Sequence, residues 1–277
     1  MSVSATDGLA LHAERHGRET DPCIVFSCAY TTTHENWRGQ IAPLTGAGWQ
    51  VVLWDHRGHG LSEAPTAPES YTMELVTRDL GAVCDWASPD RPVVLAGLSF
   101  GGLASLHWAL REPARVRALV LAGSGPGFKD PKAAERWAQQ TERTASYLER
   151  RGLQAFVGGR AGATCIGRDP ELPAAIAAAK AIEAQDPAAL AAFGRHVTGL
   201  APSVIDDLAR IVAPALVIVG GEDEAFRRAG EVMAAKLPSA VHRVVEGAGH
   251  ILNIERAEAF DAEVIAFLAG LDPAGGS

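Results

Sequence analysis

Residues 93–102 read Val-Val-Leu-Ala-Gly-Leu-Ser-Phe-Gly-Gly, an apolar run that leads into a Gly-x-Ser-x-Gly motif around Ser99. The run has the length of a buried strand, and residues 103–110 continue it with a helical pattern. A serine on a tight strand-to-helix turn projects its hydroxyl into a cleft, and so cramped a turn needs glycines beside it. The helix that follows offers free N–H groups to developing negative charge. The segment therefore predicts Ser99 as a nucleophile.

Two further residues complete a possible catalytic set. A serine hydroxyl needs a base to take its proton and a third group to orient that base. His250 follows the last apolar run, 241–245, in a glycine-containing turn, and Asp223 follows the run 215–219. Open α/β sheets place their sites at the carboxyl ends of strands. Each residue alone could equally be structural, but the order Ser, Asp, His, each just after a strand, predicts a catalytic triad.

The rest of the chain alternates short apolar runs with helix-like stretches. A helical pattern covers residues 72–86, and Asp7-Gly8 near the start is a hairpin signal. This alternation predicts an α/β fold with a mostly parallel central sheet that is covered by helices on both faces. The tail, residues 272–277, is expected to fray. The remaining predicted strands cover residues 23–27, 50–54, 92–96 and 118–122.

One interval interrupts the alternation. Residues 126–210 contain no convincing strand pattern: 131–151 and 171–185 are helical, and a glycine-rich loop over 156–169 separates them. We therefore predict a helical cap over 126–210, inserted into a core domain formed by 1–125 and 211–277. The candidate triad lies in the core, so the cap is expected to select the substrate.

Composition narrows the class of protein. A length of 277 residues suits one large domain, with 47% hydrophobic and 21% charged residues. The formal net charge of −8 argues against a nucleic-acid partner or an anionic membrane surface. We see no signal peptide and no apolar run of bilayer length, so a cytoplasmic location is expected. The four cysteines have no CxxC or zinc-type spacing, and we expect reduced thiols and no bound metal: Cys23, Cys28, Cys84 and Cys165.

Several of these segments carry a family resemblance. The Gly-x-Ser-x-Gly motif, the Ser-Asp-His order and the turn Asp55-His56-Arg57-Gly58-His59-Gly60-Leu61-Ser62 make the chain resemble the α/β-hydrolase superfamily. Asn253-Ile254-Glu255, after His250, is also familiar in type. The resemblance covers nearly the whole chain apart from the insertion. Among relatives, 3-oxoadipate enol-lactonases and small carboxylesterases look most similar, which implies hydrolysis of a small-molecule ester or lactone without a cofactor.

The resemblance also implies an oxyanion hole with one departure from the usual pattern. Many members carry His-Gly after the first core strand, whereas this chain has Cys28-Ala29 and then Tyr30. Enol-lactonases also commonly lack that His-Gly pair. The backbone N–H groups of Tyr30 and Phe100 are then the expected donors, and backbone donors do not need a particular side chain.

Other polar residues have competing interpretations. His56 and His59 could suggest a metal, but no carboxylate or cysteine completes a ligand set, so we assign both to a structural turn. Asp55 could replace Asp223 as the acid, although the family pattern makes it structural. In the cap, four residues could contact substrate, the arginines by pairing with a carboxylate, although solvation or packing is the default role: Arg160, Arg168, Arg195 and Trp137.

Two other functions stay open on the sequence. The same site could carry out C–C bond hydrolysis or a lyase or cyclase step, because fold does not fix function. A ligand-binding protein on this fold is the second alternative, although such proteins often lose a site residue, and all three are present. The sequence leaves the oligomeric state open.

Overall fold

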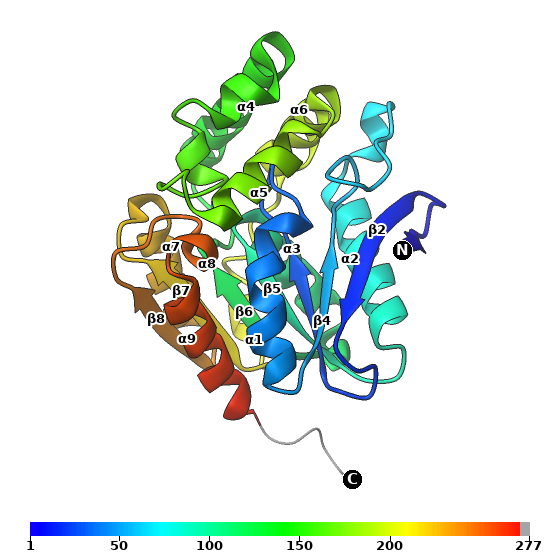
Figure 1. Ribbon diagram of the computed structural model, residues 1–277, viewed down its shortest axis with the longest axis vertical. Helices are drawn as coiled ribbons and strands as arrows, with labels where there is room; N and C mark the ends of the chain where they lie inside the picture. The colour runs from blue at the N-terminus through cyan, green and yellow to red at the C-terminus, as the bar shows by residue number, and fades with distance from the viewer. Residues whose placement is uncertain (272–277) are drawn as a thin grey trace.

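The computed structural model describes residues 1–271, so the expected fraying of 272–277 lies outside the described residues. Its centre is a sheet of eight strands in the order β1-β2-β4-β3-β5-β6-β7-β8 (Figure 1). Strands β3 to β8 run parallel to one another, and β2 runs antiparallel to both of its neighbours, β1 and β4. The strands are β1 (Ser2–Ser4), β2 (Ala10–His16), β3 (Cys23–Ser27), β4 (Gln50–Trp54), β5 (Val93–Leu98), β6 (Val116–Ala122), β7 (Ala215–Gly220) and β8 (Ala240–Val245).

Helices cover both faces of this sheet, which is why the central strands are almost continuously apolar. Successive residues of β3 alternate between two hydrophobic clusters: Ile24 and Phe26 join one, and Val25 joins the other. The first cluster packs against α1 (Ile41–Gly46), α8 (Leu252–Glu255) and α9 (Ala257–Ala269). The second packs against α2 (Met73–Ala87), α3 (Phe100–Arg111) and α7 (Glu224–Lys236).

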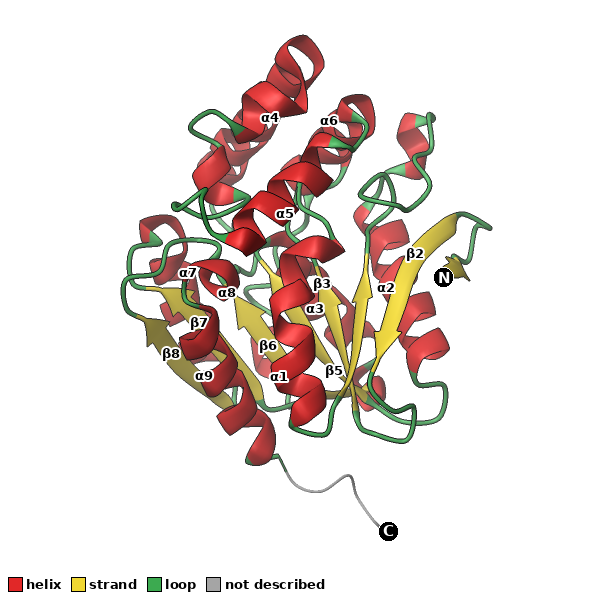
Figure 2. Cartoon of the chain, viewed as in Figure 1, coloured by secondary structure: helices red, strands yellow, loops and turns green. Residues whose placement is uncertain are grey.

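The stretch between β6 and β7 is helical, as its sequence predicts. It forms α4 (Pro131–Val157), α5 (Pro173–Glu183) and α6 (Pro187–His196), and no strand lies in it within the described residues. The helix α4 is broken at Gly152, whose φ is 75° and ψ 175°. Figure 2 shows the three helices stacked together beyond one end of the sheet. The division into a core and a cap over 126–210 remains our proposal. The short 3-10 helices are η1 (His34–Gln40), η2 (Pro68–Ser70), η3 (Pro113–Arg115), η4 (Gly162–Thr164), η5 (Thr198–Leu200) and η6 (Leu208–Arg210).

A buried ion pair fixes the turn after β4 to α2. The guanidinium of Arg57 meets the carboxylate of Asp79 in a fork, with Nε–Oδ2 and Nη2–Oδ1 distances of 2.6 and 2.7 Å. Both side chains are fully buried. Removing Asp79 would leave the buried guanidinium with a single carboxylate partner, the partly exposed Asp7 at 3.0 Å, and buried pairs that lose a partner are strongly destabilised.

Asp79→Ala is therefore expected to lower the free energy of unfolding by about 3–5 kcal/mol. Urea denaturation followed by circular dichroism measures this loss. The matched control is Glu74→Ala on the same helix, because Glu74 pairs with Arg78 and Arg111 on the exposed surface. An exposed pair contributes about 0–1 kcal/mol, so the control should unfold almost as the wild type does. Equal losses for the two variants would show that the buried pair has no special role.

Candidate active site

Ser99 occupies the turn between β5 and α3 in a strained backbone conformation. Its φ is 53° and its ψ −113°, a region that residues other than glycine rarely adopt. Its N–H donates to the carbonyl of Ala122 at the end of β6, at 2.9 Å. The hydroxyl of Ser124 donates to the carbonyl of Ser99 at 2.7 Å. The surrounding chain therefore holds the turn in place from both sides, which is how a strained residue persists at a functional site.

Two glycines of the motif are required by close approaches of the backbone. A Cβ on Gly97 would lie 2.3 Å from the carbonyl carbon of Gly101, and a Cβ on Gly101 would lie 2.3 Å from the carbonyl oxygen of Ser27. Neither neighbour is a flexible side chain that could move away. The spacing Gly-x-Ser-x-Gly thus follows from two contacts, that of Gly97 with the start of α3 and that of Gly101 with the end of β3.

Asp223 and His250 come from different loops and form a pair. The Nδ1 atom of His250 lies 2.7 Å from Oδ2 of Asp223, which is 6% exposed. The ring of Phe226 stacks on the imidazole, with centroids 4.6 Å apart and planes at 26°. A proton on Nδ1 donated to the carboxylate leaves Nε2 as the proton acceptor. The pair therefore has the arrangement of a base and its orienting acid.

The end of β6 brings this pair next to Ser99. The N–H of Ser99 donates a hydrogen bond to the carbonyl of Ala122. Gly123 follows Ala122, and a Cβ on Gly123 would lie 3.2 Å from Nδ1 of His250 and 3.4 Å from Oδ2 of Asp223. Within residues 1–271, no hydrogen bond joins Oγ of Ser99 to Nε2 of His250. Such bonds are often long until substrate binds.

The two expected oxyanion donors lie at the start of α3 and in the loop after β3. Neither the N–H of Phe100 nor that of Tyr30 has an acceptor in the described part of the chain, so both can serve an incoming oxyanion. The cap helix α6 fixes the loop, because the hydroxyl of Tyr30 donates to the carbonyl of Leu190 at 3.0 Å. The ring of Tyr30 also stacks on Phe193.

His56 and His59 form hydrogen bonds to the loop after β3. His56 donates from Nε2 to the carbonyl of Cys28 at 3.1 Å, and Nε2 of His59 accepts from the N–H of Thr31 at 3.4 Å. Burial lowers the pKa of His56 to about 3 and that of His59 to about 4, so both rings are neutral at pH 7. Their structural assignment is consistent with these contacts.

Asp55 forms a second aspartate–histidine pair, with His34. Its Oδ2 lies 2.7 Å from Nδ1 of His34, and its Oδ1 accepts from the N–H of the same residue at 2.7 Å. The other ring nitrogen of His34 faces Glu35 at 3.2 Å instead of a serine. We therefore keep Asp223 as the proposed acid.

Arg195 and Trp137 make contacts inside the helical insertion. The guanidinium of Arg195 pairs with both Glu142 and Glu149, at distances down to 2.6 Å. The indole N–H of Trp137 donates to the carbonyl of Thr198 at 2.9 Å. A substrate carboxylate would have to displace two protein carboxylates from Arg195, so we no longer propose that arginine as a substrate ligand.

Arg168 joins the insertion to the loops that carry Asp223 and His250. Its guanidinium pairs with Glu222, the neighbour of Asp223, and lies 2.6 Å from Oε2 of Glu255. It also donates to the carbonyl of Gly247 at 2.7 Å. The same Glu255 oxygen accepts from the N–H that precedes His250, at 2.9 Å. We therefore propose Arg168 as a positioning residue and no longer as a substrate ligand. The sequence did not indicate this positioning role.

Arg160 is exposed and has no ion pair within residues 1–271, so it stays a proposed substrate contact.

Arg168→Ala is expected to lower kcat about 10–100-fold with little change in KM, since small misplacements of catalytic groups have effects of this size. A neutral and an acidic ester should lose activity equally. A rise in KM confined to the acidic ester would instead make Arg168 a substrate ligand. The control is Arg195→Ala, which removes only pairs inside the insertion and should leave kcat almost unchanged.

Comparison with known proteins identifies the family. Residues 22–257 match the family described as "alpha/beta hydrolase fold". The chain belongs to the α/β-hydrolase family. This α/β hydrolase is 27% identical over 263 residues to 3-oxoadipate enol-lactonase 1 of Acinetobacter baylyi, covering 94% of this chain and 93% of that protein. It is 25% identical to a putative 2-succinyl-6-hydroxy-2,4-cyclohexadiene-1-carboxylate synthase of Bacillus subtilis, covering 98% of this chain and 99% of that protein.

A solved structure supports the same relationship. The enol-lactonase of Burkholderia xenovorans LB400 superposes on this α/β hydrolase with a TM-score of 0.83 and 27% identity, covering 97% of this chain and all of that one. The predicted fold class and the predicted resemblance to the α/β-hydrolase superfamily and to 3-oxoadipate enol-lactonases are confirmed. Among residues 1–271, no helix combines the length and apolar character that a membrane crossing needs.

Proposed function

We propose that this α/β hydrolase cleaves a small carboxylic ester or lactone, with Ser99 as nucleophile, His250 as base and Asp223 as the acid that orients it. The observation that carries the proposal is the 2.7 Å Asp223–His250 contact beside the strained turn of Ser99. Enol-lactonase relatives of nearly full length support the ester and lactone class.

The proposed reaction has two halves. Nε2 of His250 takes the proton of Ser99 as Oγ attacks the substrate carbonyl, and the N–H groups of Tyr30 and Phe100 bind the resulting oxyanion. When the carbonyl re-forms, the bond to the leaving oxygen breaks and His250 returns the proton to that oxygen. Water then attacks the acyl-enzyme with His250 again as base, which releases the acid and restores Ser99.

A fluorophosphonate probe and a substrate panel test this proposal together. The probe should add one label per chain, and mass spectrometry should locate it on Ser99. Hydrolysis should appear with at least one of three classes: short aryl esters, methyl esters and lactones. A label at Ser99 without turnover of any of them would favour the ligand-binding alternative.

A non-hydrolytic reaction is the second candidate, because one relative of nearly full length is named as a putative synthase. The same base and oxyanion donors could remove a proton next to a carbonyl and stabilise the enolate. Product analysis separates the two functions: hydrolysis in ¹⁸O-labelled water places the label in the released acid, whereas a lyase or cyclase step leaves the product unlabelled.

A further inference from the structure

The outer face of β2 carries three polar side chains in a row. Burial along this strand alternates, so that Leu11 and Ala13 point into the core and His12, Glu14 and His16 share the other face. The carboxylate of Glu14 lies between the two rings. Nε2 of His12 is 3.1 Å from its Oε1, and Nε2 of His16 is 3.1 Å from its Oε2.

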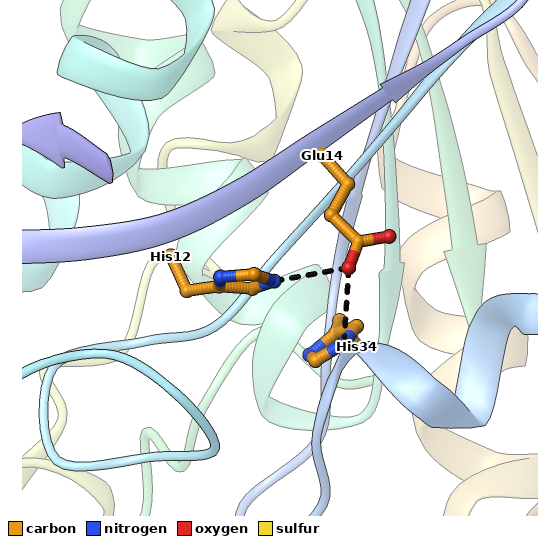
Figure 3. A group of neighbouring side chains, drawn as sticks. All are labelled: His12, Glu14 and His34. Atoms are coloured by element: carbon orange, nitrogen blue, oxygen red, sulfur yellow. Dashed lines mark hydrogen bonds and ion pairs between the residues drawn. The ribbon is translucent and has the colours of Figure 1, made fainter. Parts of the chain in front are cut away.

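The start of η1 brings a third imidazole to this carboxylate (Figure 3). Nε2 of His34 lies 3.6 Å from Oε1 of Glu14 and 3.2 Å from Oε1 of Glu35. One ligand atom each from His12, Glu14 and His34 lies within 4.8 Å of the others. The side chains of His12 and Glu14 are 15% and 21% exposed, so an ion can reach the cluster from solvent.

Asp55 fixes the orientation of the His34 ring. Its fully buried carboxylate lies 2.7 Å from Nδ1 of His34. A neutral imidazole that donates from Nδ1 carries a bare lone pair on Nε2, and here that lone pair faces the carboxylate oxygens of Glu14 and Glu35. Either a proton or a metal ion on Nε2 removes the repulsion between facing lone pairs, so the position of Nε2 is one that a cation can occupy. A carboxylate behind the histidine is also the usual outer partner of a metal-bound imidazole.

We propose that His12, Glu14 and His34 bind one divalent ion of the zinc class, through Nε2, Oε1 and Nε2, with water in the fourth position. Tetrahedral ligands about 2.0–2.2 Å from zinc lie about 3.3–3.6 Å from one another. Oε1 of Glu14 lies 3.1 Å from Nε2 of His12 and 3.6 Å from Nε2 of His34, close to this edge length. Two imidazole nitrogens favour a late first-row metal over magnesium or calcium.

Arg38 is the competing cation at this site, because it also contacts the Glu14 oxygen that would bind the ion. It pairs with both oxygens of Glu14 and lies 2.8 Å from Oε1 of Glu35. A carboxylate oxygen can accept a hydrogen bond and still bind a metal, so Arg38 can orient Glu14 while Glu14 binds the ion. Three carboxylates, those of Glu14, Glu35 and Asp55, surround the ring of His34, and this concentration of acidic groups favours a bound cation.

A bound ion would join β2 to η1, two elements that lie far apart along the chain. None of its ligands belongs to the proposed triad, so the inference does not depend on the proposed function. We expect the ion to stabilise the fold and to take no part in the chemical step. Sequence spacing gave no sign of this site, because the ligands come together only through the fold.

Calorimetric titration of the untagged full-length protein with zinc chloride, after treatment with a chelator, tests the site. One equivalent should bind with a micromolar Kd. Zinc at about a hundredfold excess over Kd should raise the Tm by about 5 °C, the shift that ligand linkage predicts for a domain of this size. Absence of binding by the wild type would overturn the proposal.

Two substitutions locate the binding, with circular dichroism as the check of folding. His12→Ala and Glu14→Gln should each weaken zinc binding at least 10–100-fold, roughly the loss caused by removing even an outer partner of a metal site. His16→Ala is the matched control, because His16 contacts Glu14 on the oxygen that faces away from the proposed ion. It should bind zinc almost as the wild type does. Wild-type affinity in the His12 variant, or an equal loss in the His16 variant, would show that the ligand set is wrong.

Discussion

Ser99→Ala is expected to lower kcat on any ester substrate by about 10³-fold or more, because the members of a triad act as a unit. Oγ of Ser99 forms the covalent bond in the proposed reaction, and no other residue can replace it. The fold should survive, since the backbone contacts of the turn to Ala122 and Ser124 do not involve the Ser99 hydroxyl. Initial rates on the substrate found in the panel measure the loss.

A second serine on α3 provides the matched control. Ser105 is fully buried, and its hydroxyl donates within the helix to the carbonyl of Gly101 at 2.8 Å. Ser105→Ala should keep both turnover and the fluorophosphonate label, whereas the Ser99 variant should lose both. If the Ser99 variant retained more than about a tenth of wild-type kcat, another nucleophile would have to be sought.

The sequence predicts well those elements whose structure is determined by residues close to one another along the chain. The runs 23–27 and 50–54 coincide with β3 and β4, because strands that are buried on both faces are apolar at every position. Ser99 could be identified for a similar reason, since the glycines that its turn requires lie two residues to either side. The insertion over 126–210 could be predicted because its sequence has amphipathic helical patterns in place of the apolar runs typical of strands.

Contacts between segments far apart in sequence could not be predicted. Arg168 looked like a possible substrate ligand because an isolated arginine in a loop says nothing about its partners, and those partners, Glu222 and Glu255, lie in other loops. The cluster around Glu14 depends on His34, at the start of η1, coming next to β2, which no local pattern encodes. The same holds for His56 and His59, whose partners belong to the loop after β3.

Asp223→Asn is expected to leave the fold intact and to lower kcat by about 10²–10⁴-fold. The amide is nearly the same size as the carboxylate, but it can donate a hydrogen bond to Nδ1 of His250, which favours the tautomer with its proton on Nε2. That tautomer cannot accept the proton of Ser99. The amide also removes the negative charge that stabilises the imidazolium when it forms. Steady-state kinetics on the same ester measures the loss, with circular dichroism as the check of folding.

The second aspartate–histidine pair makes this assignment testable within the same chain. Asp55→Asn changes an equally close contact, but one whose histidine faces Glu14 and Glu35 in place of a serine. It should lower the Tm, since the buried carboxylate accepts backbone N–H bonds from His34 and Leu61. The kcat of its folded fraction should stay within about tenfold of the wild type, because a group outside the catalytic set affects transition-state stabilisation only indirectly. A loss above about a hundredfold in a well-folded Asp55 variant, with near-normal kcat in the Asp223 variant, would move the acid from Asp223 to Asp55.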